Sequence, residues 1–318
     1  MTKSLACFFL IALALPAQTE DKHRVHSLRI QVLSTMLADT GIGEWGFAAL
    51  VDADGRRILF DTGAHPDTVL MNARDLKLDL SGIDEVIITH NHDDHTGGLL
   101  TLRREYSKRN PGAVSQAHVG KGIFDSRRAG SRPGEGNPMI ATKAAYEATG
   151  GRFIVHDHPV ELYPGIWLTG PVPRKYPEKN WSPGVQLLTP AGLIEDNLPE
   201  DQSLVFDTDQ GLVLLSGCGH AGIINTLEYA RSTVRKAPVH AAIGGFHLFR
   251  LDDAGLEWTA SKLREFQLAN FMGAHCTGIE AVYRLRQLIG LNRQTCSVGA
   301  VGGTFVLGKK MDPGQIAR

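Results

Sequence analysis

Cysteine, net charge and long apolar runs are all scarce in this chain. Its 318 residues include 4 cysteines, and 33 basic against 34 acidic residues leave a formal net charge of -1. So few cysteines argue against a disulfide framework, and the balanced charge gives no indication of a nucleic-acid partner. Beyond the N-terminus, no apolar run is long enough to span a membrane. We therefore expect a small-molecule substrate, with no nucleic acid and no membrane as partners, and the sequence does not indicate an oligomeric state.

The N-terminal segment predicts a secretory signal peptide. Lys3 supplies a positive charge, Leu5 to Leu15 is almost wholly apolar, and Leu15-Pro16-Ala17 offers a cleavage site. We expect residues 1–17 to be removed, which would make the mature protein periplasmic or secreted. An uncleaved N-terminal anchor is the alternative.

The densest group of polar residues follows Val86 to Ile88, an apolar run that predicts a buried strand. Three histidines and two aspartates lie within six consecutive positions there, His90-Asn91-His92-Asp93-Asp94-His95. Imidazole and carboxylate groups are ligands of zinc and of other transition metals. Without a cation, so many titratable groups at a strand end would repel or desolvate one another. The segment therefore predicts a metal site rather than a solvated turn.

The motif His90-x-His92-x-Asp94-His95 resembles the HxHxDH signature of the metallo-β-lactamase-fold hydrolases. Other segments are similar to the branch that includes the dihydropterin ribofuranosyl-aminobenzene phosphate synthase-like proteins, namely Glu200 to Leu204, Ser216 to Ile223, Ile243 to Leu248 and His275 to Gly278. The resemblance covers nearly all of the chain after about residue 27. It implies one domain over 27–310 with the α/β fold of this family, a four-layer αββα sandwich.

The resemblance also implies two divalent metal ions, with zinc as the first expectation and iron or manganese as alternatives. The first two histidines of the motif would bind metal 1, whereas its aspartate and last histidine would bind metal 2, together with the histidine of the last segment. The full set of candidate ligands is His90, His92, Asp94, His95, His220, His275 and Cys218.

Cys218 and His220 follow the apolar strand 212–215, where the superfamily usually has a metal-bridging aspartate. Cys218 stands in register with that aspartate, and His220 is a candidate for the third histidine, which is not found upstream. Cys218 can also be a buried small hydrophobe. Whether Cys218 or His220 completes the site stays open here. Cys276 also lies in a motif segment, as a ligand or as the neighbour of one, and a bridge from Cys276 to Cys296 is a further possibility.

Two residues are candidates for a catalytic role. Asp94 would orient the hydroxide besides binding metal, and His247, which follows a strand, would contact substrate, donate a proton or bind metal. By resemblance, Asp61 orients the metal histidines through hydrogen bonds. The remaining histidines without a motif at a strand end are expected at the surface: His65, His118, His156 and His158.

The rest of the pattern predicts strands first and then strand–helix alternation, which is typical of two sheets with helices outside. In the first half we expect a strand at 27–34, a hairpin at 45–61, and helices at 66–77 and 99–108. In the second half we expect strands at 203–207, 212–215, 239–243, 270–273 and 298–307, and helices at 223–235, 254–267 and 278–289. Two irregular segments predict a long loop, at 126–137, and either a substrate-facing flap or a surface insertion, at 172–199.

Together these features predict a periplasmic or secreted metal-dependent hydrolase that uses a metal-bound hydroxide. A pterin-linked transferase or synthase of the same fold is the alternative, although a signal peptide argues against it. A non-catalytic metal- or ligand-binding protein is the third possibility. A cysteine nucleophile at Cys218 and a dinucleotide site at Gly217-x-Gly219-x-x-Gly222 each explain fewer residues.

Overall fold

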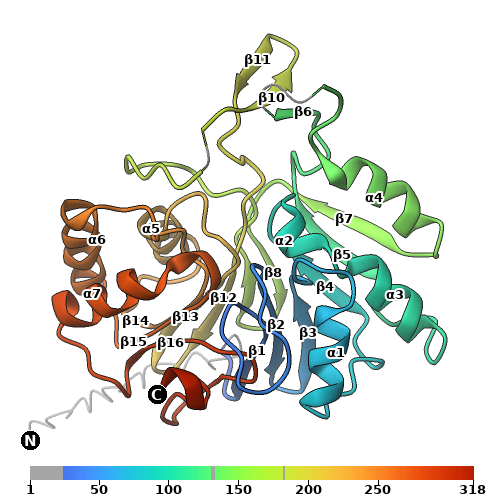
Figure 1. The fold of residues 1–318 in the computed structure, drawn as a ribbon. Helices are drawn as coiled ribbons and strands as arrows, with labels where there is room; N and C mark the ends of the chain where they lie inside the picture. Colours follow the sequence, from blue (N-terminus) through green and yellow to red (C-terminus); the bar gives the residue numbers. More distant parts are fainter. Residues whose placement is uncertain (1–23, 130–132, 182) are drawn as a thin grey trace, which may run out of the picture.

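The computed structural model describes residues 24–129, 133–181 and 183–318 (Figure 1). The predicted signal peptide, residues 1–17, lies outside the described residues. Within them, no helix is both long enough and apolar enough to cross a membrane. Two seven-stranded sheets pack face to face, and helices cover the outer surface of each sheet. This arrangement confirms the predicted four-layer αββα sandwich.

The first sheet has the strand order β17-β1-β2-β3-β4-β5-β7. Its strands are β1 (Leu28–Ser34), β2 (Ala48–Ala53), β3 (Arg56–Phe60), β4 (Glu85–Ile88), β5 (Gln116–Gly120), β7 (Arg152–His156) and β17 (Thr304–Val306). Its outer face packs against α1 (Thr68–Asp75), α3 (Leu99–Ser107) and α4 (Pro138–Glu147). Val69, Leu102 and Tyr146 bring these helices onto Leu59 and Val86 of the sheet.

The second sheet has the order β16-β15-β14-β13-β12-β9-β8. Its strands are β8 (Val160–Tyr163), β9 (Ile166–Leu168), β12 (Leu204–Thr208), β13 (Gly211–Ser216), β14 (Val239–Gly244), β15 (Asn270–Gly273) and β16 (Cys296–Val298). Its outer face carries α5 (Ile223–Thr233), α6 (Asp253–Glu265) and α7 (Ile279–Ile289). The predicted strands and helices of this half agree with these elements to within a few residues, except that the last strand region is split between the two sheets.

Successive side chains along a strand point to opposite faces of the sheet, so that each strand contributes to two hydrophobic cores, one between the sheets and one beneath the outer helices. In β3, Ile58 and Phe60 point between the sheets, whereas Leu59 points to the outer helices. Val213 and Ile243 of the second sheet meet them in the same inner core. Burial on both faces explains why the strands are apolar nearly throughout.

The site lies where parallel strands of both sheets end. β4 runs parallel to β3 and β5, and its carboxyl end leads into the short helix α2 (Asp93–Thr96). β13, β14 and β15 are also parallel, and β15 leads into a 3-10 turn, η1 (His275–Thr277). A second such turn, η2 (Gln315–Ala317), is near the C-terminus. In α/β folds, ligands bind beyond the carboxyl ends of such strands.

A third, three-stranded sheet stands apart from the sandwich (Figure 1). It consists of β6 (Arg127–Ala129), β10 (Val185–Thr189) and β11 (Gly192–Glu195). We call these strands the flap. Segment 126–137 is therefore not wholly a loop as predicted, because its first residues pair with β10. Segment 172–199 is likewise not wholly irregular, because it contains the β10–β11 hairpin.

One guanidinium fastens the flap to the sandwich. The Arg127 side chain donates to Asp196 Oδ2 through Nε and to Glu200 Oε2 through Nη2, both at 2.7 Å, and all three side chains are buried. Asp196 follows the flap strand β11, whereas Glu200 precedes β12 of the second sheet. The ion-pair triad therefore joins the flap to the body of the protein.

The surface position predicted for His118 is wrong. Its side chain is only 6% exposed, with Nδ1 2.9 Å from His156 Nε2 and Nε2 3.5 Å from Glu85 Oε1. His118 lies on β5 between β4 and β7 of the same sheet, and its partners Glu85 and His156 come from these two strands, a lateral contact that the sequence pattern does not reveal. His156 is half-buried, whereas His65 and His158 are exposed as predicted.

Candidate metal centre

The first part of the site comes from the end of β4. His90 and His95 are fully buried, whereas Asp94 is about one-fifth exposed. The turn of α2 places Asp94 and His95 beyond the two histidines that precede it. Gly97 follows, and a Cβ there would lie 1.9 Å from the Ala64 carbonyl oxygen. Glycine therefore allows the metal loop to pack against the segment that follows β3.

Three histidines form the first ligand group. The ring nitrogens of His90, His92 and His220 can all lie within 4.8 Å of one another. His220 comes from the turn between β13 and α5, so that the second sheet completes a group begun by the first. These are the histidines that the sequence assigned to metal 1, with His220 as the candidate for the third.

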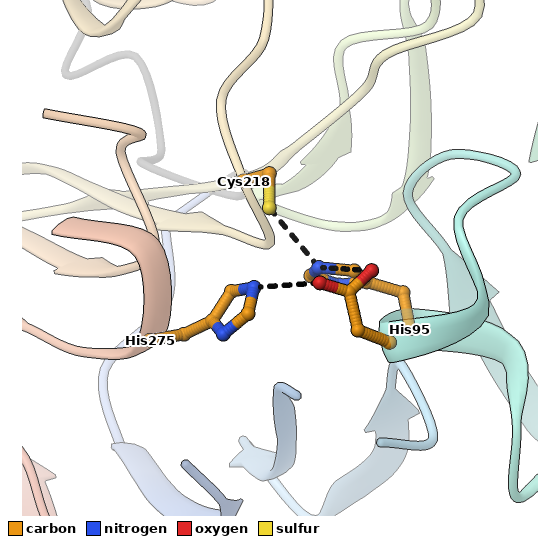
Figure 2. A group of neighbouring side chains, drawn as sticks. His95, Cys218 and His275 are labelled. Atoms are coloured by element: carbon orange, nitrogen blue, oxygen red, sulfur yellow. Dashed lines mark hydrogen bonds and ion pairs between the residues drawn. The ribbon is translucent and has the colours of Figure 1, made fainter. Parts of the chain in front are cut away.

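Four residues form the second group: Asp94, His95, Cys218 and His275. His275 Nε2 is 3.2 Å from Asp94 Oδ2, and His95 Nε2 is 3.1 Å from Cys218 Sγ (Figure 2). The sequence left open whether Cys218 or His220 completes the site. The structure places His220 in the first group and Cys218 in the second, and the two also meet in a third group with His247, so that one does not exclude the other.

The hydrogen bonds around the first group leave nitrogen lone pairs unsatisfied. His220 Nδ1 contacts the Asn180 carbonyl, which can only accept, so His220 Nε2 carries no proton when the ring is neutral. His90 Nδ1 contacts Thr89 Oγ1, whose own proton goes to Asp61 Oδ2, so His90 Nε2 is also bare. The two Nε2 atoms lie 3.2 Å apart. Two lone pairs at this distance need a cation between them, and the residues therefore fit a metal ion.

Asp61 orients the second group, as expected from its place after β3. Its Oδ2 accepts from His95 Nδ1 at 2.7 Å and from Thr89 Oγ1 at 2.9 Å, and its Oδ1 accepts from the Thr89 backbone N–H. The bond at Nδ1 directs His95 Nε2 to Cys218 and Asp94. A carboxylate that fixes the other nitrogen of a histidine is the usual partner of a metal-bound imidazole.

Comparison with known proteins shows the family of the chain. The family described as the metallo-beta-lactamase superfamily matches residues 46–228. The chain belongs to this superfamily. It is 29% identical over 268 residues to the 7,8-dihydropterin-6-methyl-4-(beta-D-ribofuranosyl)-aminobenzene-5'-phosphate synthase of Methanocaldococcus jannaschii, a match that covers 81% of this chain and 90% of that protein.

Solved structures of the superfamily share the fold. Tm1679, described as a metal-dependent hydrolase of the beta-lactamase superfamily, is 26% identical, with a TM-score of 0.70 over 87% of this chain and 98% of that one. Zinc-bound PqqB from Methylobacterium extorquens is 15% identical, with a TM-score of 0.53 over 87% and 99% of the two chains. The latter likeness concerns the fold alone.

Burial and neighbouring charges lower the pKa values of the histidines in the first ligand group. Burial and the neighbouring histidines lower the pKa of His90 and of His220 well below the usual range. Burial also lowers the pKa of His92 to about 4, although Asp94 opposes the shift. The first group is therefore neutral at physiological pH, as metal-binding imidazoles must be.

The second group is more strongly polarised. Burial would lower the pKa of His95, but the charges of Asp61 and Asp94 outweigh it and raise the value to about 9. Burial would raise the pKa of Asp94, yet the charges of His95 and His275 hold it well below its usual range. Positive charge is thus favoured in this group, and a metal ion can supply it in place of the proton on His95.

Within the described chain, Cys218, Cys276 and Cys296 are free thiols. The sulfur nearest to Cys276 belongs to Cys218, at 3.2 Å, and Cys296 contacts the Val282 carbonyl instead. The possible bridge from Cys276 to Cys296 is therefore absent from the described part of the chain. Cys276 is the neighbour of a candidate ligand, one of the two roles that its motif allowed.

His247 lies beside both groups. It can share a ligand set with Cys218 and His220, and its ring lies 4.7 Å from the His220 ring. Neither ring nitrogen has a hydrogen-bond partner among the described residues. The left-handed backbone of His247, with φ of 48°, is unusual for a residue with a side chain and turns the ring toward the site. Both ring nitrogens are thus without a hydrogen-bond partner among the described residues, beside the two ligand groups.

Sequence reasoning missed three residues of the site. Asn180 holds His220 through its carbonyl, although it lies in a segment without a regular pattern. Trp45 and Phe249 place their rings against His275 and His247. Phe249 follows the His247 motif by two residues, which is the one signal that could have identified it.

Proposed function

We propose that the protein is a dinuclear metal-dependent enzyme that joins a dihydropterin to an aminobenzene, as the name of the Methanocaldococcus jannaschii synthase describes. The metal dependence rests on one observation: two groups of candidate metal ligands lie next to each other, with Cys218 of one group close to His220 of the other. The pterin chemistry is supported by the 29% identity over 81% of the chain. A hydrolase was the first expectation from sequence, and the synthase, then the alternative, now has the better support.

His90, His92 and His220 would hold one ion, and Asp94, His95, Cys218 and His275 the other. Bound divalent ions, zinc first and iron or manganese as alternatives, would supply stabilisation of negative charge on the substrate and on its leaving group. The burial of nearly all of these side chains keeps water from weakening that attraction.

The chain's own residues then have separate tasks in the transfer. The amino nitrogen of the aminobenzene attacks the carbon attached to position 6 of the pterin, and an anionic leaving group departs with the electron pair of its bond to that carbon. The nitrogen gives up a proton, which a ring nitrogen of His247 can accept because it has no partner in the described structure. Asp94, held ionised by His95 and His275, can orient the attacking amine.

Hydrolysis is a second candidate, favoured by the 26% identity and the TM-score of 0.70 to Tm1679. Water would take the place of the amine as the attacking group, and His247 would return a proton to the leaving group. Both candidates use the same residues, so that the difference between them lies in what binds next to the metals.

The deciding experiment compares the two reactions in one preparation. The purified protein, with its metal content measured by elemental mass spectrometry, is incubated with the diphosphate ester of 6-hydroxymethyl-7,8-dihydropterin and with ribofuranosyl-aminobenzene phosphate. We expect the joined product in liquid chromatography–mass spectrometry, and its loss in His92→Ala and Asp94→Ala. Turnover of esters, lactones, lactams or phosphodiesters without any joined product would contradict the synthase and favour the hydrolase.

Export is a separate part of the proposal. We propose, from Lys3 and the apolar segment after it, that residues 1–17 are removed and that the enzyme acts in the periplasm or outside the cell. N-terminal sequencing of the protein from separated cell fractions tests this. A cytosolic protein that keeps residues 1–17 would contradict export and remove the argument that a signal peptide raises against the synthase. An exported protein would favour hydrolysis instead.

A further inference from the structure

Two large aromatic side chains are exposed directly beside the metal groups. Trp45 is 48% exposed and Phe249 is 39% exposed, and their ring centroids are 5.6 Å apart with the planes at 74°. Trp45 lies in the segment before β2, whereas Phe249 lies between β14 and α6. Different sheets therefore contribute the two rings.

Each ring also touches a histidine of the site. The centroid of Trp45 is 4.9 Å from that of His275, and the centroid of Phe249 is 5.1 Å from that of His247. Exposure of large apolar rings to water is unfavourable, and a contiguous exposed apolar patch often marks a binding site. Core packing does not explain why these two rings are exposed beside the metal groups. A substrate ring that covers them would provide one.

The backbone holds both rings in place by close approach at glycines. A Cβ on Gly46 would lie 2.9 Å from the Asp94 carbonyl oxygen, to which the next residue, Phe47, donates its N–H. A Cβ on Gly278 would lie 2.7 Å from Phe249 Cβ. The backbone that follows Trp45 is thereby held against the metal loop, and Phe249 packs against the start of α7, as expected for a preorganised binding surface.

The apolar surface continues from Phe249. Together with Leu251 and with Ile279, which is 44% exposed, Phe249 lines a shallow cavity of about 210 Å³. The exposed rings therefore belong to a larger apolar surface that begins at the metal groups. A flat molecule on this surface would have its reacting atoms near His247 and His275.

We propose that Trp45 and Phe249 form an aromatic platform that binds a planar aromatic ring of the substrate and positions it at the metal centre. The inference rests on the proposed function and gives it a substrate class, because both a pterin and an aminobenzene are flat rings. Because the planes of Trp45 and Phe249 stand at 74°, a flat ring would stack on one side chain and meet the other edge-to-face, and both contacts would select aromatic rings over saturated ones of similar size.

The test uses two kinds of probe on the metal-loaded protein. The first is 6-methyl-7,8-dihydropterin. The second is the pair phenyl phosphate and cyclohexyl phosphate, which share a phosphate and differ in aromaticity. Affinities are measured by calorimetry for the wild type, Trp45→Ala, Trp45→Phe, Phe249→Ala and the control Ile140→Ala, which changes a 39% exposed side chain on α4. Metal content is measured in parallel.

We expect the wild type to bind the pterin and to prefer phenyl over cyclohexyl phosphate. Trp45→Ala and Phe249→Ala should weaken aromatic binding by roughly 5- to 10-fold at unchanged metal content, since an aromatic contact is worth about a kilocalorie. Trp45→Phe should restore most of the affinity, and Ile140→Ala should bind as the wild type does.

Different results distinguish the two proposals. If the pterin binds and both alanine variants bind it as tightly as the wild type, the platform is refuted while the synthase survives. If the pterin does not bind but the preference for phenyl phosphate depends on Trp45, the platform is supported and the pterin substrate is refuted. Absence of any aromatic preference in the wild type would overturn the platform outright.

Discussion

The Sγ atoms of Cys218 and Cys276 lie 3.2 Å apart, and Cys276 Sγ also accepts the backbone N–H of His247 at 3.3 Å. Cys218 Sγ therefore has two neighbours at similar distances, Cys276 Sγ and His95 Nε2. Because burial raises the pKa of the Cys218 thiol, a cation is needed to make it a thiolate ligand. Under the proposed function the two sulfurs would have different tasks, Cys218 as a ligand and Cys276 as its support.

Replacement of Cys218 by alanine should therefore remove one ion only. The three histidines of the first group remain, so we expect metal content to fall from about two ions to about one per chain, as a complete group still binds. Elemental mass spectrometry of dialysed protein measures this. Cys296→Ala, a buried thiol elsewhere, is the matched control. Retention of both ions in Cys218→Ala, with loss of one in Cys276→Ala, would reverse the assignment.

Asp61→Asn should weaken the second metal site without emptying the first. The amide keeps the size of the side chain but cannot accept all three hydrogen bonds from Thr89 and His95. Loss of such an orienting partner costs about 10- to 100-fold in metal affinity. Zinc titration against a competing chelator gives the affinity. Asp75→Asn, on the exposed end of α1, should bind as the wild type does; equal affinities for both variants would show that Asp61 does not orient His95.

Arg127→Ala should destabilise the protein strongly. The substitution leaves Asp196 and Glu200 buried without their cation, and breaking a buried ion pair in this way costs about 3–5 kcal/mol. Urea denaturation followed by circular dichroism measures the free energy of unfolding. The neighbouring Arg128 is exposed, and Arg128→Ala should change stability by about 0.5 kcal/mol or less. Similar losses in the two variants would mean that the triad does not anchor the flap.

The pH dependence of stability should contain a contribution from Glu178. Its carboxylate accepts N–H groups of Ile224 and Asn225 at the start of α5, but burial outweighs these bonds and raises its pKa to about 7. The native state then keeps a proton that the unfolded chain releases near pH 4.5, so that stability falls as pH rises from about 4.5 to 7, by up to about 3 kcal/mol.

Glu178→Gln should flatten the profile over this range. Denaturation at a series of pH values compares this variant with the wild type and with Glu147→Gln, which changes an exposed carboxylate at the end of α4. A profile of Glu178→Gln that parallels the wild type would show that Glu178 is ionised in the native state throughout.

The sequence predicted those parts of the fold that depend on local patterns. The strand at 270–273 and the helices α5, α6 and α7 follow from apolar periodicity between glycine-marked turns, and the structure has them close to the predicted bounds. The flap could not be predicted in this way. Its strand β6 has three residues, and its pairing with β10 joins segments separated by more than fifty positions.

In the site too, residues that are close in sequence could be predicted, whereas residues that only the fold brings together could not. His90, His92, Asp94 and His95 were recognisable because they are close in sequence. The allocation of Cys218 and His220 to different groups depends on how the turn after β13 faces the metal loop, which no spacing encodes. Trp45 lay beyond prediction, since its significance comes only from its contact with His275, which follows it by more than two hundred residues.

The division of the ligands between the sheets has a consequence for assembly. Four ligands follow β4 of the first sheet, and three follow β13 and β15 of the second. Neither sheet therefore carries all the candidate ligands of either group, and under the proposed function metal would bind with full affinity only after the two halves have docked. Metal uptake would then be a late event in maturation and a reporter of correct docking: a chain released with its halves misaligned would be recognised by its low metal content, even if each sheet had formed.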